Sequence, residues 1–237
     1  MIEAVAGFLA GLIAGTFGIG GGAVSIPFLI FMLGLPLPIA IGTDLVIVTI
    51  NSLASLYFHL RQGTIAWKGT VMGLVGASAT LLGHYLFLMS IKAHVLKLIV
   101  GISFILLSFT MWIKVDGNKE PGLKELIATG IIMGIDSALL GKGGGSIAIP
   151  VLVALFKVRT KEAIKASVAA TPIVAMTAMA EKCLSGLCEP LIALKFAPFL
   201  ILGSYAGTKL MRLSSSEALK IGYSLFLLIT GLLILVS

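Results

Sequence analysis

Long apolar stretches, separated by short polar or glycine-rich interruptions, follow one another along almost the whole chain. Stretches of roughly 20 apolar residues are long enough to cross a hydrocarbon core about 30 Å thick. The pattern predicts helices at about residues 2–17, 23–35, 39–60, 69–89, 94–114, 124–140, 146–157, 162–182, 190–211 and 217–236. The longest polar stretch runs only from Lys114 to Glu125, which leaves little chain for a soluble domain. We therefore predict an all-α polytopic membrane protein.

Two glycine clusters interrupt this pattern at matched positions in the two halves of the chain. The stretch Gly18–Pro27 reads GIGGGAVSIP, and Gly141–Pro150 reads GKGGGSIAIP. Each glycine and the closing proline recur at an offset of 123 residues (141 minus 18). Glycine runs break helices, and the flanking helices of about 12–17 residues span only roughly 18–25 Å. Paired breaks of this kind are typical of the substrate site of a membrane transporter.

The basic residues of the loops distinguish two topologies. If each glycine-broken helix pair starts and ends on one side of the membrane, 12 basic residues fall on one face and 4 on the other. If each pair crosses the membrane once, the division is 9 to 7. Positive charge accumulates in cytoplasmic loops, so the first topology is favoured. It places the loops 61–68, 114–124, 157–165 and 209–220 in the cytoplasm and both termini outside.

The same topology makes the two halves inverted repeats, because each half holds one returning pair and three full spans. We predict a first transmembrane repeat over 1–115, a cytoplasmic linker over 116–123 and a second repeat over 124–237. Further matches at this offset are Ile41 with Ile164, Gly63 with Gly186, Leu96-Lys97 with Leu219-Lys220 and, after one inserted residue, Gly83 with Gly207. Inverted repeats whose broken helices meet near the midplane are a recurring plan in transporters.

The glycine clusters are the predicted anion site. An unwound segment exposes amides that cannot stay unpaired in lipid, and the helix that follows each cluster presents its positive end. Lys142 adds a full positive charge where the first cluster has Ile19; its alternatives are an ion pair with Asp136 or a path to the surface. The expected substrate-binding residues here are Gly18, Gly20, Gly21, Gly22, Gly141, Lys142, Gly143, Gly144 and Gly145.

Polar residues inside the following spans extend this candidate site. Those expected to contact substrate are Thr43, Asn51, Ser167 and Thr171. Asp44 and Asp136 are candidates for carrying a coupling proton. Instead of carrying a proton, Asp44 could cap a helix or lie in the headgroup region. Instead of contacting substrate, Asn51 could form hydrogen bonds between helices.

Composition and motif searches exclude several other classes of protein. Hydrophobic residues make up 58% of the chain and charged ones 11%, against about 25% charged residues in a soluble domain. The net charge of +7 marks cytoplasmic loops rather than a nucleic-acid partner. The first glycine cluster matches the spacing of the dinucleotide-binding fingerprint. That motif also requires a preceding strand, and the segment before this cluster is predicted to be a membrane helix. We predict no catalytic residues, no metal site and no cofactor, and interpret His59, His84 and His94 as structural.

Cys183 and Cys188 flank a short turn on the predicted outer face. Disulfides persist outside the cytoplasm, but two cysteines alone leave open whether this pair is oxidised.

The paired motifs resemble those of the sulfite exporter family TauE/SafE, whose members carry a G-x-G-G-G motif followed by a proline in each half. Gly18–Pro27 and Gly141–Pro150 carry the resemblance, which covers essentially the whole chain. It implies a secondary transporter of a small sulfur-containing anion, such as sulfite or an organosulfonate, coupled to a proton or sodium. Lys142 is a departure, since an uncharged residue also fits the motif. The alternatives are an uncoupled anion channel and a transporter of small carboxylates; the oligomeric state stays undetermined.

Overall fold

A computed structural model describes residues 2–20, 22–64, 66–88, 119–140 and 143–236, with scattered positions between 95 and 109. The regular structure of these residues is helical, apart from one isolated bridge between Lys119 and Val158. The helices are α1 (Ile2–Phe17), α2 (Gly22–Phe31), α3 (Leu37–Arg61), α4 (Gly69–Leu88), α6 (Leu123–Leu140), α7 (Gly145–Pro150), the π-helical turn η1 (Val151–Leu155), α8 (Thr160–Leu184), α9 (Pro190–Leu213) and α10 (Ser216–Val236).

The all-α prediction is confirmed, and most predicted helices have boundaries within a few residues of the observed ones. Among the described residues, α3, α8, α9 and α10 are long and apolar enough to cross a membrane. The helix predicted over 94–114 lies largely outside the described residues.

Two predicted helices differ from the observed ones for local reasons. The helix predicted over 23–35 ends at Phe31, because Gly34 adopts a φ of 65° and the amide of Leu35 folds back to the carbonyl of Leu29. The helix predicted over 146–157 divides into α7 and η1 at Pro150. Proline has no N–H to donate within a helix, and widened π turns are one way to absorb such a break.

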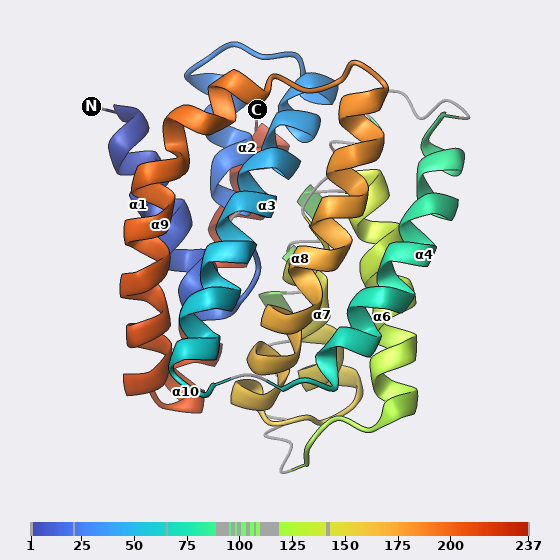
Figure 1. Ribbon diagram of the computed structural model, residues 1–237, viewed down its shortest axis with the longest axis vertical. Coiled ribbons are helices and arrows are strands. Elements are labelled where there is room, and N and C mark those ends of the chain that lie inside the picture. Colours follow the sequence, from blue (N-terminus) through green and yellow to red (C-terminus); the bar gives the residue numbers. More distant parts are fainter. Residues whose placement is uncertain are drawn as a thin grey trace.

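The two short helix pairs enter the molecule from opposite ends (Figure 1). Helix α1 descends from the upper end of the view and α2 returns toward it, whereas α6 rises from the lower end and α7 with η1 returns there. Both chain termini lie at the upper end. The long helices α3 and α8 run between the two pairs and are more buried than α9 and α10.

Glycines let the helices of two extensively packed pairs, α1 with α9 and α4 with α6, approach one another at backbone distance. A Cβ atom at Gly11 of α1 would lie 2.9 Å from the amide nitrogen of Ser204 in α9. A Cβ atom at Gly134 of α6 would lie 2.9 Å from the carbonyl carbon of Gly76 in α4. Gly11 and Gly134 are related by the same offset of 123 residues (134 minus 11). Small residues allow van der Waals packing where the bilayer offers no hydrophobic driving force.

Hydroxyl groups add hydrogen bonds across the same two helix pairs. Thr16 of α1 donates to the carbonyl of Gly207 in α9 at 3.3 Å, and Thr80 of α4 donates to that of Gly134 in α6, also at 3.3 Å. Each hydroxyl also donates to a carbonyl of its own helix. Each of these pairs joins the first half of the sequence to the second.

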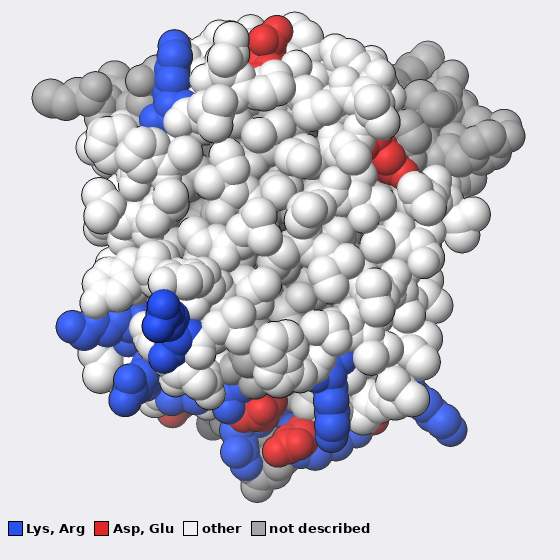
Figure 2. Space-filling view, in the orientation of Figure 1, with Lys and Arg blue, Asp and Glu red and all other residues white. Residues whose placement is uncertain are grey.

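Charged side chains separate to the two ends of the molecule. On the face shown in Figure 2, Lys and Arg gather at the lower end, opposite the two termini, and a wide uncharged band lies above them. The loops joining α3 to α4, η1 to α8 and α9 to α10 lie at this basic end. The uncharged band is the surface expected of the part of a protein that faces lipid.

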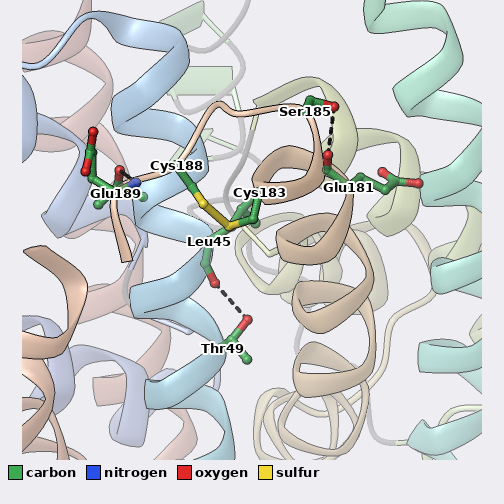
Figure 3. Close-up of a disulfide and its surroundings, with 8 residues drawn as sticks. Leu45, Thr49, Glu181, Cys183, Ser185, Cys188 and Glu189 are labelled. Atoms are coloured by element: carbon green, nitrogen blue, oxygen red, sulfur yellow. Dashed lines mark hydrogen bonds between the residues drawn. A yellow bond between two sulfur atoms is a disulfide. The ribbon is translucent and has the colours of Figure 1, made fainter. Parts of the chain in front are cut away.

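At the other end, a disulfide between Cys183 and Cys188 closes the turn from α8 to α9 (Figure 3). The loop rests on the beginning of α3, where Gly42 allows the carbonyl of Leu187 to approach its backbone. The amide of Glu189 donates to the Thr43 hydroxyl at 3.0 Å. The disulfide that the sequence left open is therefore present in this structure, and its loop holds the upper end of α3.

Gly11→Ala and Gly134→Ala should each lower the free energy of unfolding by roughly 1–3 kcal/mol, because the new methyl group meets backbone atoms that cannot move aside. Gly222→Ala is the matched control: it is also a helical glycine, but its nearest neighbour would be a ring carbon of Phe17 at 3.6 Å. Thermal unfolding of the purified variants in one detergent measures the difference. Equal melting temperatures for all three variants would contradict the packing described for α1 and α6.

Candidate functional site

The two glycine clusters lie side by side in the centre of the protein. A Cβ atom at Gly145 would lie 2.7 Å from the Cα of Ile19 and 3.0 Å from the carbonyl oxygen of Gly18. The described members of the clusters are all buried: Gly18, Ile19, Gly20, Gly22, Gly143, Gly144 and Gly145. Gly21, Gly141 and Lys142 lie outside the described residues. The contact joins positions that are more than half the sequence apart.

Left-handed backbone conformations break the helices at both clusters. The φ angles are 67° at Gly18 and 80° at Gly20 in the first, and 67° at Gly143 and 71° at Gly144 in the second. Any other L-residue is strained in this region. Helix α1 ends with the amide of Gly18 donating to the carbonyl of Ala14 at 2.7 Å, and α7 begins directly after Gly144.

Val48 of α3 and Thr171 of α8 lie between the clusters. The positions of a Cβ atom at Gly20 and at Gly143 both point against the same methyl group of Val48. The Thr171 hydroxyl would lie 2.8 Å from a Cβ atom at Gly145, and its methyl group 3.4 Å from one at Gly20. Val48 and Thr171 differ by 123 residues (171 minus 48). Sequence reasoning identified Thr171 but not Val48, although the offset pairs the two positions.

Ser167 and Thr171 hold the first cluster in place from α8. The Ser167 hydroxyl donates to the carbonyl oxygen of Gly18 at 2.9 Å, and the Thr171 hydroxyl is shared between that oxygen, at 3.1 Å, and the Ser167 carbonyl of its own helix, at 2.8 Å. That carbonyl has left the helical ladder, and in a low-dielectric environment an unpaired carbonyl costs free energy. The two hydroxyl groups expected to contact substrate thus bind the backbone of the glycine cluster itself.

Asn51 of α3 forms hydrogen bonds between helices, which was the alternative to substrate contact that the sequence left open for it. Its amide nitrogen donates to the carbonyl oxygens of Gly20 at 3.2 Å and Ala10 at 3.1 Å. Its side-chain oxygen accepts a hydrogen bond from Ser204 of α9 at 3.0 Å. A single buried amide therefore joins α1, α3 and α9 to the glycine cluster.

Asp44 is fully buried one helical turn from Val48, beside the beginning of α2. One of its carboxylate oxygens accepts a hydrogen bond from Ser25 of α2, and the other has no hydrogen-bond partner within the described residues. The N-cap of α3 is Pro36, so Asp44 does not cap the helix to which it belongs. Thr43 points elsewhere, to the amide of Glu189.

The second cluster has its own polar surroundings, made by α7 and α10. Pro150 cannot donate to the carbonyl of Ser146, and the Tyr223 hydroxyl donates to that carbonyl instead, at 2.6 Å. Asp136 of α6 is buried and interacts electrostatically with Tyr223. The hydroxyl of Ser146 is buried and has no hydrogen-bond partner in the described part of the chain. Sequence reasoning passed over Ser146, although it directly follows the second cluster.

The histidines that the structure describes do not form a metal site. His59 lies at the lower end of α3, with its ring nitrogens 2.9 Å from the carbonyl oxygen of Gly15 and 3.0 Å from the Thr64 hydroxyl. The described residues contain no group of three His, Cys, Asp or Glu side chains placed to bind a metal ion. His94 and the side chain of His84 lie outside them. His59 therefore connects the end of α3 to α1.

Comparison with known proteins identifies the family. The model of the sulfite exporter TauE/SafE family matches residues 3–234. The probable membrane transporter protein MJ0441 of Methanocaldococcus jannaschii is 32% identical, over 98% of this chain and 93% of its own. Probable membrane transporter proteins of Haemophilus influenzae, at 26%, and Bacillus subtilis (YunE), at 24%, also match over at least 94% of either chain. No solved structure matches this chain.

The chain therefore belongs to the sulfite exporter TauE/SafE family. It is a multi-pass membrane protein of a transporter family, not an enzyme. The recognition made from the two glycine motifs is confirmed.

A double-mutant cycle tests the anchoring of the first cluster. Ser167→Ala or Thr171→Val alone leaves one hydroxyl on the Gly18 carbonyl, so each should reduce stability only slightly. Together they leave that buried carbonyl unpaired, at a cost of about 1–3 kcal/mol, which should exceed the sum of the single effects. Thermal unfolding measures the cycle, with Thr177→Val as the control because Thr177 bonds only within α8. Additive effects would contradict the shared role of the two hydroxyl groups.

Proposed function

We propose that this protein is a secondary transporter that moves a small sulfur-containing anion, such as sulfite or an organosulfonate, by alternating access. The contact between the two broken-helix segments is the observation that carries the proposal. Discontinuous helices that meet inside a transporter commonly form its substrate site. Membership of the TauE/SafE family supports the sulfur-containing anion. An uncoupled anion channel and a carrier of small carboxylates are the competing functions.

The proposed site uses backbone amides and the helix ends that follow the clusters. The first amides of α2 and α7 have no preceding carbonyl within their helices, and two helix starts together favour an anion. The Ser146 hydroxyl, which has no hydrogen-bond partner among the described residues, adds a donor at the second cluster. By its place in the sequence, Lys142 would add a full positive charge to the same cluster. We expect the anion between the clusters, nearer the second.

We further propose that the chain consists of inverted repeats over 1–115 and 124–237, joined by 116–123. Matched contacts support this division. Gly22 lies against Asp44 and Val48, and Gly145, its counterpart at the offset of 123, lies against Thr171, the counterpart of Val48. The pairs α1–α9 and α6–α4 repeat the same glycine packing. The opposite directions of the two short helix pairs in Figure 1 agree with an inversion.

The proposed orientation follows from the charged ends of the molecule. Positive charge favours the cytoplasmic side, so the lower end in Figure 2 is assigned to the cytoplasm and both termini to the outside. The disulfide between Cys183 and Cys188 would then face an oxidising compartment, which supports the same orientation. In this orientation, α1 and α2 would enter the membrane from the outside, and α6 and α7 from the cytoplasm.

Proton coupling through Asp44 is the second part of the proposed mechanism. A carboxylate beside the beginning of α2 would repel an anion held at that helix end, and a protonated one would not. Anion binding and protonation of Asp44 would therefore favour each other, as two linked ligands do. The oxygen of Asp44 that has no hydrogen-bond partner among the described residues is the atom available to the proton. A sodium ion there is the competing coupling ion, and Asp136 the competing carboxylate.

Gly143→Ala should reduce transport of labelled sulfite or sulfoacetate into proteoliposomes at least about tenfold, because the added methyl group would collide with Val48. Gly63→Ala is a matched control, since φ is 64° there against 67° at Gly143, and its Cβ position is open. Both variants carry the same backbone strain, and only one disturbs the contact of the clusters.

A second substitution tests whether the collision with Val48 causes the loss of transport. Adding Val48→Ala to Gly143→Ala removes the colliding methyl group and should restore part of the lost transport. Equal transport by the two glycine variants would place the site elsewhere. Wild-type protein that moves neither sulfite, sulfonates nor carboxylates would contradict an anion carrier. Anion flux that ignores every imposed ion gradient would favour the channel.

Asp44→Asn should abolish the response of transport to an imposed pH gradient while leaving substrate exchange across the membrane active. Asparagine fills the same volume and cannot gain or lose a proton, whereas exchange needs no net proton movement. Asp136→Asn is the control, because it changes the other buried candidate carboxylate in the same way. Acceleration by a pH gradient in Asp44→Asn, and its loss in Asp136→Asn, would transfer the coupling role to Asp136.

A further inference from the structure

A basic cavity lies outside the transport site, at the lower end of the molecule between the ends of α3 and α9. Its volume is about 430 Å³, and its lining residues are Phe58, Arg61, Gln62, Tyr205, Lys209, Arg212 and Leu213. Phe58 and Tyr205 form an edge-to-face ring contact with centroids 5.3 Å apart, which joins the two helices at the cavity. The cavity therefore has an aromatic wall and a cationic wall.

No acidic side chain in the described part of the chain neutralises the three cations of the cavity. Within the described residues, no carboxylate forms a salt bridge with Arg61, Lys209 or Arg212. Elsewhere at the same end lysines do have acidic partners, as in the 2.7 Å pair of Lys165 with Glu162. Three positive charges around one cavity repel one another, and an anion in the cavity would remove that repulsion.

Arg61 and Gln62 are already arranged to receive a polar group. The Arg61 guanidinium stacks on the ring of Tyr57 at 5.5 Å and donates to the Tyr57 hydroxyl at 3.3 Å, which restricts its position. The side-chain oxygen of Gln62 is buried and has no hydrogen-bond partner in the described part of the chain. A ligand that carries both an anionic group and a hydroxyl group would satisfy the cations and this acceptor together.

The helix surface beside the cavity is apolar and exposed. Its large side chains on α3 and α9 are Leu53, Tyr57, Leu202, Tyr205, Leu210 and Leu213. Aromatic residues next to basic ones are typical of the level at which a membrane protein meets phospholipid headgroups. The combination of a basic cavity and a neighbouring apolar surface fits a ligand with one anionic end and long acyl chains.

We infer that this cavity binds the headgroup of an anionic phospholipid, with Arg61, Lys209 and Arg212 on the phosphodiester and the acyl chains along α3 and α9. Guanidinium groups match phosphate oxygens in geometry, and each basic residue near an anionic membrane surface adds to the affinity for anionic lipid. A free anion, such as phosphate or the transported substrate, shares the phosphate-like chemistry but uses none of the apolar surface.

The test compares phosphatidylglycerol with phosphatidylcholine and with inorganic phosphate, using the purified full chain in a neutral detergent. Thermal unfolding and native mass spectrometry measure binding. Phosphatidylglycerol should raise the melting temperature and stay bound, whereas phosphatidylcholine and phosphate should do neither. In Arg61→Gln/Lys209→Gln/Arg212→Gln, the affinity for phosphatidylglycerol should fall by about tenfold or more, since three such contacts are lost.

A second triple variant controls for net charge. Lys68→Gln/Lys124→Gln/Lys161→Gln removes the same charge from the basic end without touching the cavity and should bind phosphatidylglycerol within about twofold of wild type. If the cavity variant unfolds, Arg212→Gln alone is titrated instead. Equal losses in both triple variants, or equal stabilisation by inorganic phosphate, would overturn the proposal. Lipid binding is measured without substrate, so the result stands whatever the transport assays show.

Discussion

The structure depends on one constraint, which is that backbone groups released by a broken helix need new partners inside a membrane. Each partner comes from another helix: Ser167 and Thr171 serve the carbonyl of Gly18, Asn51 serves that of Gly20, and Tyr223 serves that of Ser146. These hydrogen bonds connect the broken-helix segments to α8, α3 and α10. The buried positions of Asn51, Ser167, Thr171 and Tyr223 therefore follow from the two glycine clusters.

The helices and their order were predictable because they depend on local pattern. Apolar length defined the spans, and glycine and proline defined most of their ends. The division at Pro150 has a local cause that the apolar pattern does not show, because the missing N–H of proline breaks the helix without interrupting the apolar stretch. What no local pattern shows is the donor to the Ser146 carbonyl, which comes from Tyr223, 77 residues away. The loop that the disulfide closes likewise packs on Gly42, and no local pattern in the sequence pairs Gly42 with Leu187.

For the candidate site, the sequence selected polar residues that the structure places beside the clusters, but it did not predict which groups they contact. Thr171 and Asn51 were selected because polar groups are costly in a span, and that cost is real. It is offset here by hydrogen bonds to the backbone of the first cluster. Val48 was missed because an apolar side chain in an apolar span carries no signal of its own. The internal repeat supplies that signal, since it pairs Val48 with Thr171.

The asymmetry between the two clusters bears on where an anion would bind. In the first cluster, three side chains from two helices donate hydrogen bonds to the backbone carbonyls. At the second cluster, Tyr223 of α10 donates a hydrogen bond to the Ser146 carbonyl. The Ser146 hydroxyl itself is buried and has no hydrogen-bond partner within the described residues. An anion needs hydrogen-bond donors that are not committed to the protein, and within the described residues the Ser146 hydroxyl is such a donor. The second cluster meets that requirement better, and it is also the one whose sequence contains Lys142.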